Sequence, residues 1–440
     1  MRCECCGSTN VQINVEQKSG YSVKKGILGT LLFGSVGAVA GINGKQETNK
    51  TYHCLACGKV GSLSEVVMTD YTEKRINKAL SSNDINELTT LKKQYRNLEF
   101  NLDLIQNTNN ELDEFVAYNK HFKINRGVLE RYNGNAEEVM IPDEVTIIGE
   151  LAFEKCSSLK SIIIPNSVTE IGVGAFLECI SLTNIILPES VISIGQAAFS
   201  NCSSLTSINL PNSLIKIDRS AFLKCSSLKS ITLPKSVTTI SWGAFEYCSS
   251  LTDIIIPNTV TEIGSAAFRG CISLARIFIP NSVTKINIST FEGCTTLKYI
   301  TIPDSVTEIS GGAFSHCTSL THIDVGESNN GLKTIDGNLY SKDGKVLVQY
   351  AIGKSDNLFI VADSVTKIHG HSFEGCKALK SIIIHNGVTN IGVSAFEGCS
   401  SLKIYCAAKE KPKGWSEYSF GNWNKSNCPV IWGYKEDNNF

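Results

Sequence analysis

The sequence repeats itself every 23 residues, and this period constrains the fold more than any other feature. A single unit of this length cannot bury its own apolar face, so neighbouring units must stack into a solenoid with one continuous core. The register pauses after Cys317 and resumes at Phe373, which gives ten units counted by their Phe and Cys. The repeated cysteines are Cys156, Cys179, Cys202, Cys225, Cys248, Cys271, Cys294, Cys317, Cys376 and Cys399.

Each unit reads S-L-x-x-I-x-I-P-x-S-V-T-x-I-G-x-x-A-F-x-x-C, and each position has a physical role. The apolar residues before the proline predict a short strand, which Pro211 ends in its unit because proline lacks the N–H that a ladder needs. Ala221 and Phe222 are expected to fill the interior from a tight helical or 3₁₀ turn. The predicted fold class is therefore an α+β repeat solenoid, with a short strand and a helical turn in each unit.

This unit resembles the repeat of the BspA-type leucine-rich repeat family, and the core from Ile164 to Leu182 carries the resemblance. The likeness implies a solenoid over 121–440 with an N-terminal cap at 121–141. It also implies an inserted hairpin at about 326–360, turning at Asp343-Gly344, and a C-terminal cap at 403–440. Members of that family are known as surface adhesins and as interaction proteins.

The remaining cysteines include two pairs, Cys3-x-x-Cys6 and Cys54-x-x-Cys57, each followed by glycine. Four thiolates suit a structural Zn²⁺ with no open coordination position, so residues 1–61 are predicted to form a zinc-ribbon-like module. The pairs lie farther apart than the roughly 15–20 residues of a standard ribbon. Cys5 and His53 are alternative ligands, and a redox dithiol is the alternative chemistry.

Between the two pairs lies an uncharged, glycine-rich segment, 26–44. As a helix it would reach about 28 Å, close to the thickness of a bilayer core. A single span would place the two cysteine pairs on opposite sides of the membrane, where they could not share one zinc ion. A packed or self-associating loop is therefore favoured, with contact at a membrane interface as the alternative.

Residues 62–120 contain no proline and are predicted to form a helical connector. Asp84 and Glu87 have the spacing of a capping box, and Leu91, Leu98 and Leu112 share one heptad position. The helix either packs against its neighbouring modules or self-associates as a coiled coil through 84–117.

Composition and motifs argue against an enzyme and against a nucleic-acid partner. The formal net charge is −1, which gives no electrostatic footprint for nucleic acid. The sequence shows no phosphate-binding glycine loop and no nucleophile elbow. The seven histidines are scattered and are expected to be solvated or to lie in loops. His369-x-His371 is a weak candidate for metal binding.

Strand alternation predicts which side chains face solvent. The two outward rows, which end at Ser381 and Ile383, are mostly small and polar, but one stretch carries aromatic and arginine side chains typical of binding hot spots. We expect a protein partner to bind there, and this partner-binding set is Ile255, Arg276, Phe278, Tyr299 and His322.

Two functional classes remain open. The first is an intracellular, non-enzymatic scaffold that binds a protein on the strand face. Its support is the N-terminus, Met1 to Cys6, which lacks the apolar region of a secretory signal and favours a cytoplasmic location. The second is a cell-surface adhesin of the BspA type, exported by a route that the N-terminus does not show. Peripheral membrane association is a further alternative for the location.

Overall fold

The computed structural model describes residues 11–14, 51–54, 60–62, 121–418 and 421–435. The chain divides into two units, Met1–His121 and Phe122–Phe440. In the first unit, three short strands pair antiparallel in the order β1-β2-β3. They are β1 (Val11–Asn14), β2 (Thr51–Cys54) and β3 (Val60–Ser62).

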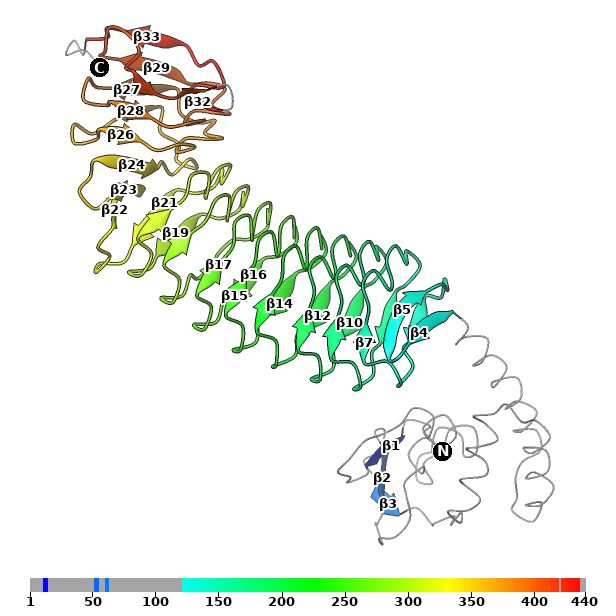
Figure 1. The fold of residues 1–440 in the computed structure, drawn as a ribbon. Coiled ribbons are helices and arrows are strands. Elements are labelled where there is room, and N and C mark those ends of the chain that lie inside the picture. Colours follow the sequence, from blue (N-terminus) through cyan, green and yellow to red (C-terminus); the bar gives the residue numbers. More distant parts are fainter. Residues whose placement is uncertain (1–10, 15–50, 55–59, 63–120, 419–420, 436–440) are drawn as a thin grey trace, which may run out of the picture. The chain divides into compact units, whose positions relative to one another are not determined.

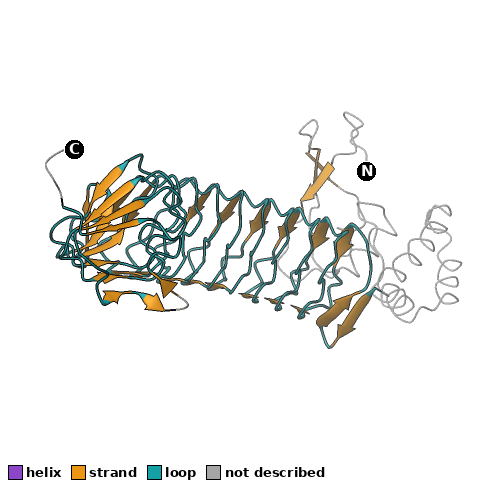
Figure 2. Cartoon of the chain, turned by 90° about the horizontal axis from the view of Figure 1, so that it is seen from above, coloured by secondary structure: helices purple, strands orange, loops and turns teal. Residues whose placement is uncertain are grey.

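The second unit is a solenoid whose coils stack to form two facing walls (Figures 1 and 2). The wall built from the longer strands is called the strand face here, and the opposite one the second wall. The strand face comprises β6 (Glu138–Met140), β8 (Ser161–Ile163), β10 (Asn184–Ile186), β12 (Ser207–Asn209), β14 (Ser230–Thr232), β16 (Asp253–Ile255), β19 (Tyr299–Ile302), β21 (His322–Val325), β25 (Leu358–Ile360), β27 (Ser381–Ile384), β29 (Lys403–Cys406) and β33 (Val430–Trp432).

The second wall is built mainly from strands of two residues. It comprises β5 (Val128–Tyr132), β7 (Ile147–Ile148), β9 (Glu170–Ile171), β11 (Ser193–Ile194), β13 (Lys216–Ile217), β15 (Thr239–Ile240), β17 (Glu262–Ile263), β18 (Lys285–Ile286), β20 (Glu308–Ile309), β24 (Val346–Gln349), β26 (Lys367–Ile368), β28 (Asn390–Ile391) and β30 (Gly414–Trp415). At the start of the solenoid, β4 (Phe122–Asn125) pairs antiparallel with β5, which pairs in parallel with β7.

Successive coils are in parallel register on both walls. On the strand face, Asn184 of β10 pairs with Ser161 of β8 and with Ser207 of β12. Hydroxyl groups add a second ladder between the walls, where Ser167 Oγ donates to the carbonyl of Val145, one coil earlier, at 2.7 Å. Because every coil repeats these bonds, one short sequence motif is enough to specify the whole stack.

The corner that carries the Ala-Phe pair is not helical, which corrects the predicted α+β class. The described residues form strands and turns and contain no helix. Each corner holds left-handed residues, such as Leu151 (φ 55°) and Lys155 (φ 59°). A left-handed residue stops helix propagation, and alternate N–H groups bond to the next coil instead. The N–H of Phe153, for example, donates to the carbonyl of Ala175 at 2.7 Å.

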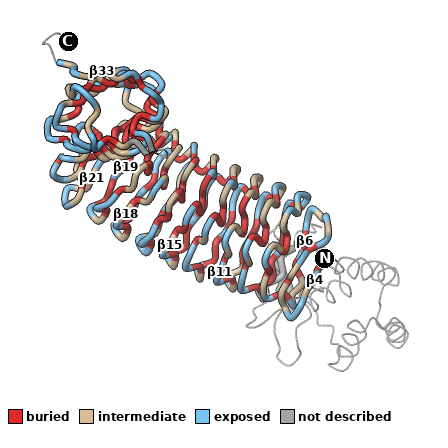
Figure 3. Tube along the Cα trace, turned by 45° about the horizontal axis from the view of Figure 1, so that its top comes forward, coloured by how far each residue is buried: buried red, intermediate tan, exposed pale blue. Residues whose placement is uncertain are grey.

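The core is a column of phenylalanine rings, one from each coil. The rings from Phe153 to Phe314 stack with centroids 5.1 to 5.8 Å apart and planes within 11° of parallel. Every ring in this column is fully buried, and Figure 3 shows buried residues recurring from coil to coil along the stack. Burial of one such side chain stabilises the fold by roughly 1.5–3 kcal/mol.

The periodic cysteines lie at the same corner as free thiols. Nine of the ten are buried, and Cys156 of the first 23-residue repeat is partly exposed. Cys225 Sγ donates to the carbonyl of Phe199, one coil earlier, at 3.1 Å, and the same bond recurs along the stack. Burial raises the pKa of these thiols, in Cys202 to about 12. They therefore act as small buried residues rather than as reactive groups, as the sequence predicts.

An insertion divides the solenoid into two parts, residues 122–325 and 332–435. Here β22 (Leu332–Ile335) and β23 (Asn338–Ser341) form an antiparallel hairpin, and β23 pairs with β24, which joins β26 of the second wall. At the corner no chain intervenes, because the N–H of His316 donates directly to the carbonyl of Glu374 at 3.2 Å. Extra chain on one side only wedges the coils apart, so the axis bends. Figure 3 shows the first coils from the side and the last nearly end-on.

The C-terminal end closes on tryptophans. Trp423 follows the small hairpin β31 (Glu417–Tyr418) and β32 (Gly421–Asn422). Its carbonyl accepts the N–H of Phe396 at 3.2 Å, as the alanine before the phenylalanine does in a regular coil, and its ring packs edge-on against Phe396 with centroids 5.9 Å apart. Trp415 packs against it with ring centroids 4.8 Å apart. Both indoles are buried, which gives the last coil an apolar cover.

None of the described residues belongs to a helix long and apolar enough to cross a bilayer. The apolar segment 26–44 lies outside the described residues, and so do the connector residues 63–120. The predicted membrane contact of the first and the predicted self-association through 84–117 of the second therefore stay predictions.

Candidate functional site

The candidate site lies on the strand face, on four consecutive coils near the inserted hairpin. Strand alternation positions it: in β16 the side chain of Ile254 is buried, whereas that of Ile255 is 74% exposed. The same alternation continues in the next two coils, where Phe278 is 72% and Tyr299 60% exposed. The strand-face patch is thus Ile255, Arg276, Phe278, Tyr299 and His322.

Contacts between coils order the polar and aromatic members of this patch. Arg276 Nη2 lies 3.4 Å from Asp253 Oδ2, one coil earlier, and both side chains are well exposed. Such a surface ion pair is worth less than about 1 kcal/mol. It therefore orients the guanidinium but is weak enough for a partner to replace it. The rings of Tyr299 and His322, which are paired residues of β19 and β21, have centroids 5.7 Å apart and planes 34° from parallel.

The inserted hairpin borders the patch. The N–H of Ile323 donates to the carbonyl of Gly337 at 2.9 Å. Gly337 has a φ of 68°, and a Cβ there would lie 3.1 Å from His322 Cδ2. The turn between β22 and β23 therefore lies against His322 and ends the exposed rows of the first part of the solenoid.

One residue predicted to face outward does not. Ile383 of β27 is only 7% exposed, although it occupies the same strand position as Ile255. Its partners in register are Ile360 of β25 and Tyr405 of β29, so an isoleucine and a tyrosine flank it. The outward rows predicted from the sequence are correct up to the insertion and fail at this position beyond it.

A shallow depression also lies on the strand face, over β10, β12 and the end of β14. Its polar lining includes Asn184, Asn209 and Glu189, and Glu189 Oε2 accepts hydrogen bonds from the backbone N–H and the side-chain amide of Asn212, at 2.9 and 3.3 Å. A single carboxylate without a histidine or nucleophile supports hydrogen bonding but provides no acid–base pair for catalysis.

Of the four predicted zinc ligands, only Cys54 is among the residues that the structure describes. Cys54 ends β2, where it pairs in register with Val11, but Cys3, Cys6 and Cys57 lie outside the described residues. In the part of the chain that the structure describes, no three His, Cys, Asp or Glu side chains are arranged so that they could hold a metal ion, and this covers His369 and His371. Zinc binding at the N-terminus remains a prediction.

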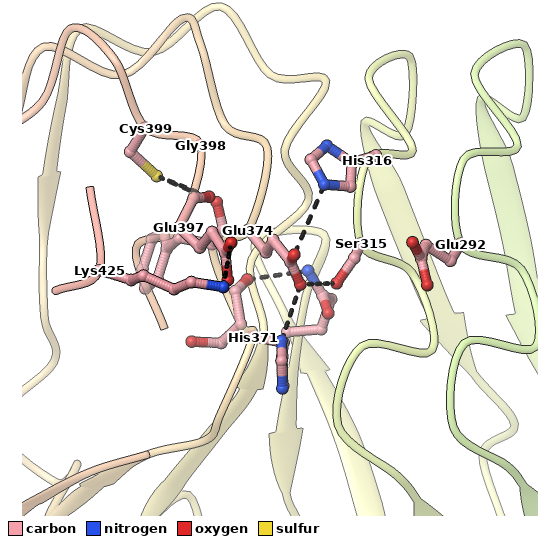
Figure 4. Close-up of polar contacts among 12 residues, drawn as sticks. Glu292, Ser315, His316, His371, Glu374, Glu397, Gly398, Cys399 and Lys425 are labelled. Carbon is pink, nitrogen blue, oxygen red and sulfur yellow. Dashed lines mark hydrogen bonds and ion pairs between the residues drawn. The ribbon is translucent and has the colours of Figure 1, made fainter. Parts of the chain in front are cut away.

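The junction between the two parts of the solenoid holds a polar cluster centred on Glu374 (Figure 4). Glu374 Oε2 lies 2.7 Å from His371 Nδ1 and accepts a hydrogen bond from Ser315 Oγ at 2.6 Å. Glu374 Oε1 lies 3.5 Å from His316 Nε2. These residues come from two corners separated by the insertion, so the cluster ties those corners together.

The surroundings of Glu374 shift its protonation. Burial by itself would raise the pKa of this carboxyl, but hydrogen bonds from His316, His371 and Ser315 together hold the pKa well below its usual range. The hydrogen bond to Glu374 in turn raises the pKa of His316, against the opposing effect of burial. The junction therefore favours a carboxylate facing an imidazolium.

Sequence reasoning missed this cluster, because it placed the histidines among solvated or loop residues. The available signal was the offset between Ser315 and Glu374, which is 59 residues where neighbouring coils are offset by 23. Had the insertion been subtracted from the numbering, His316 and Glu374 would have fallen on adjacent corners.

The sequence that forms this parallel stack of 23-residue coils matches a known family model. The model described as "BspA type Leucine rich repeat region", present in six copies, matches residues 123–252, 238–352 and 350–429. The chain belongs to this family. Its repeats span most of the solenoid, and no curated protein matches the sequence.

Several solved structures are similar to this BspA-type protein. A leucine-rich cell surface protein from Faecalibacterium prausnitzii A2-165 is 30% identical over 67% of this chain and 75% of its own, with a TM-score of 0.49. A leucine-rich repeat protein from Bacteroides ovatus is 30% identical over 65% of this chain and 69% of its own, with a TM-score of 0.46. The pneumococcal vaccine antigen PcpA is 22% identical over 64% and 66%, with a TM-score of 0.39.

Proposed function

We propose that this BspA-type protein is a non-enzymatic interaction protein that binds a protein partner through the strand-face patch. Phe278 carries the proposal. Its side chain is 72% exposed, so the ring contributes little to the stability of the fold and is available to a partner. Aromatic and arginine side chains dominate binding energy at protein interfaces, and the patch gathers both on consecutive coils.

We infer surface display, as in an adhesin, rather than the cytoplasmic location expected from the N-terminus. The support is the sequence identity to a relative that is described as a cell surface protein. Protease shaving of intact cells tests this inference. Release of solenoid peptides from intact cells would support display, and full protection of the protein until lysis would favour the cytoplasmic scaffold.

The patch is tested by affinity capture from the protein's own cellular or host environment, followed by mass spectrometry. The Phe278→Ala/Tyr299→Ala variant should lose the partners that the wild type retains. Ile163→Ala/Ile186→Ala is the matched control, since both isoleucines are exposed on the same strand face but lie on other coils. Equal capture by the patch variant and the wild type would contradict the proposal.

We further propose that Cys3, Cys6, Cys54 and Cys57 hold a structural Zn²⁺ that stabilises the N-terminal unit. The support is the chemistry of the two Cys-x-x-Cys-Gly pairs. Elemental analysis of the full-length protein should find one zinc per chain and none after Cys3→Ser/Cys6→Ser substitution. Retention of zinc by that variant would exclude this ligand set.

A further inference from the structure

Backbone hydrogen bonds join successive coils along the second wall. In a regular coil, two N–H groups around the short strand donate to the coil before. The N–H of Thr238 donates to the carbonyl of Ile215 at 2.8 Å, and that of Ser241 donates to the carbonyl of Ile217 at 2.9 Å. Both bonds recur at the equivalent positions of most coils, so their loss marks a local change in the stack.

Residues 122–325, all of which the structure describes, lose both bonds at two places. At the first, no backbone bond joins the N–H groups of Ile215 and Asp218 to the preceding coil. At the second, the same holds for Thr284 and Asn287. The strands agree, since β11 does not pair with β13 and β17 does not pair with β18. We call these places the first joint and the second joint.

The strand face is interrupted at the same coils. Across the first joint, β12 does not pair with β14. At the second joint, residues 276–279 form no strand and pair with neither β16 nor β19. Elsewhere before the insertion, the described strands of each wall pair with their neighbours. The two walls therefore open together at each joint.

The corner with the phenylalanine column stays closed at both joints. The N–H of Phe199 donates to the carbonyl of Ala221 across the first joint, and that of Phe268 donates to Thr290 across the second, each at 2.9 Å. The stacked rings there have centroids 5.5 and 5.8 Å apart.

At the turn opposite that corner, one serine hydroxyl still spans each joint. Ser213 donates to the carbonyl of Val191, and Ser282 donates to that of Val260. Coils that are joined at one corner, and opposite it by a single hydroxyl, can tilt about the corner as about a hinge.

One position of the repeat distinguishes the joints from the regular coils. In the coils that keep the ladder, the residue after the short strand of the second wall is small: Gly172, Gly195, Ser241, Gly264 and Ser310. Space there is tight, because a Cβ on Gly264 would lie 2.5 Å from the backbone nitrogen of Trp242, one coil earlier. The joints carry Asp218 and Asn287 instead, which are larger than serine.

The polar groups of these two side chains also work against the ladder. Asn287 Nδ2 donates to the carbonyl of Ile263 at 2.7 Å and so takes the acceptor that a backbone N–H uses in regular coils. The carboxylate of Asp218 cannot donate to the coil before, and its Oδ1 accepts the N–H of Arg219 at 2.6 Å.

Both surface features of the strand face lie at these joints. The shallow depression reaches from β10 and β12 to Thr232 and Pro234 of the next coil, across the first joint. The strand-face patch spans the second joint, with Phe278 before it and Tyr299 after it.

We propose that the solenoid is hinged at Asp218 and Asn287, so that the strand face changes its curvature where its depression and its patch lie. Tilting at the second joint changes the separation of Phe278 and Tyr299, and a partner that contacts both selects one curvature. This last step rests on the proposed function. The hinges themselves belong to the free protein and are tested without a partner, so the two can fail separately.

The test is hydrogen exchange of the free full-length protein, measured by mass spectrometry with fragmentation to single residues. After correction for intrinsic rates, the amides of 215–218 and 284–287 should exchange at least about tenfold faster than those of 238–241 and 261–264, which lie in regular coils. Asn287→Ser introduces the residue that regular coils tolerate. It should slow exchange at 284–287 and, because the walls open together, also at 276–279 on the strand face.

Two substitutions at one regular position are the matched controls. Ser241→Asn should create a joint and speed exchange at 238–241 and at 253–255 on the strand face, whereas Ser241→Gly should leave both unchanged. Equal exchange at the joints and in the regular coils of the wild type would overturn the proposal. So would a response confined to the substituted wall, which would indicate a local distortion without a hinge. Should Asn287→Ser unfold the chain, Asp218→Ser makes the same comparison at the first joint, with 215–218 and 230–232.

Discussion

Two glutamates at the same repeat position behave oppositely in the regular array and at the junction. Glu246 follows Phe245 in the regular array, and Glu374 follows Phe373 at the junction. Burial raises the pKa of Glu246, and the like charge of Glu292 adds to this, although Arg269 Nη1 lies 3.6 Å away and opposes the shift. The pKa of Glu374 is instead lowered by the hydrogen bonds of the cluster.

The difference teaches what the repeat specifies and what it does not. In the regular array, the neighbours of a corner residue are set by the period, so Glu246 meets the side chain 23 positions on. At the junction, the insertion brings together corners 59 residues apart, and Glu374 meets Ser315 and His316. In the regular array, successive corners are held together by the buried phenylalanine column. At the junction, the polar cluster around Glu374 connects the two corners.

The largest expected effect lies in the phenylalanine column. Phe222 is fully buried and stacks between Phe199 and Phe245, with both ring centroids 5.5 Å away. Phe222→Ala should lower the free energy of unfolding by about 3–5 kcal/mol, because it leaves a cavity that the rigid stack cannot fill. Urea denaturation followed by circular dichroism measures this loss.

The matched control is Phe278→Ala, the same substitution on the same solenoid at an exposed position. It should change the free energy of unfolding by no more than about 0.5 kcal/mol. Similar losses in the two variants would mean that the patch is part of the core and is not available for a partner.

The contrast explains how much could be predicted from the sequence. The period alone predicts the coils, the buried phenylalanines and cysteines and the exposure of Phe278, because each depends only on neighbours in register. The helical turn was wrong, since the left-handed Leu151 and Lys155 direct alternate N–H groups to the next coil. The cluster of Glu374 and the burial of Ile383 depend on the insertion and on local neighbours, which no repeat position encodes.

At the junction, Glu374→Gln should lower the free energy of unfolding by about 2 kcal/mol at pH 6, since it leaves two imidazoles and a hydroxyl without their shared acceptor charge. Glu246→Gln is the control at the same repeat position. Its pKa is raised, so the folded state already disfavours the charge, and the amide should cost less than about 0.5 kcal/mol. Thermal unfolding of both variants ranks the two sites, and equal costs would erase the distinction drawn between them.

A smaller gain is expected beside the cluster. Ser372 is fully buried and its hydroxyl has no hydrogen-bond partner, whereas the equivalent residue of the preceding corner is Ala313. Ser372→Ala should raise the free energy of unfolding by about 1 kcal/mol, because it removes an unsatisfied buried hydroxyl. The reciprocal Ala313→Ser should lower it by a similar amount. A destabilised Ser372→Ala variant would show that the hydroxyl has a partner in solution, such as a buried water.

The smallest effect is the pH dependence of the junction. The pKa of His316 is raised above its ordinary 6.5 in the folded protein. Its contribution to the free energy of unfolding is therefore complete below pH 6.5 and is lost as the pH rises through the folded-state pKa. The pKa of Glu374 is lowered from its ordinary 4.5, so its contribution is present above that pH and is lost as the pH falls. The pair of His316 and Glu374 therefore contributes most to the free energy of unfolding between pH 4.5 and 6.5.

Other charges face the same histidine, since Glu292 and Glu397 also favour its protonated form, and Glu397 is itself paired with Lys425 at 2.7 Å. The His316 side chain is 43% exposed, so solvent screens its interaction with Glu374. The stability lost above pH 6.5 should therefore be below about 1 kcal/mol. His316→Gln should flatten the stability profile between pH 6 and 9, measured by urea unfolding. His322→Gln, whose imidazole contacts Thr321 and Tyr299 rather than a carboxylate, should leave the profile unchanged. A profile that keeps its slope in His316→Gln would assign the pH dependence to another group and remove His316 from the account of the junction.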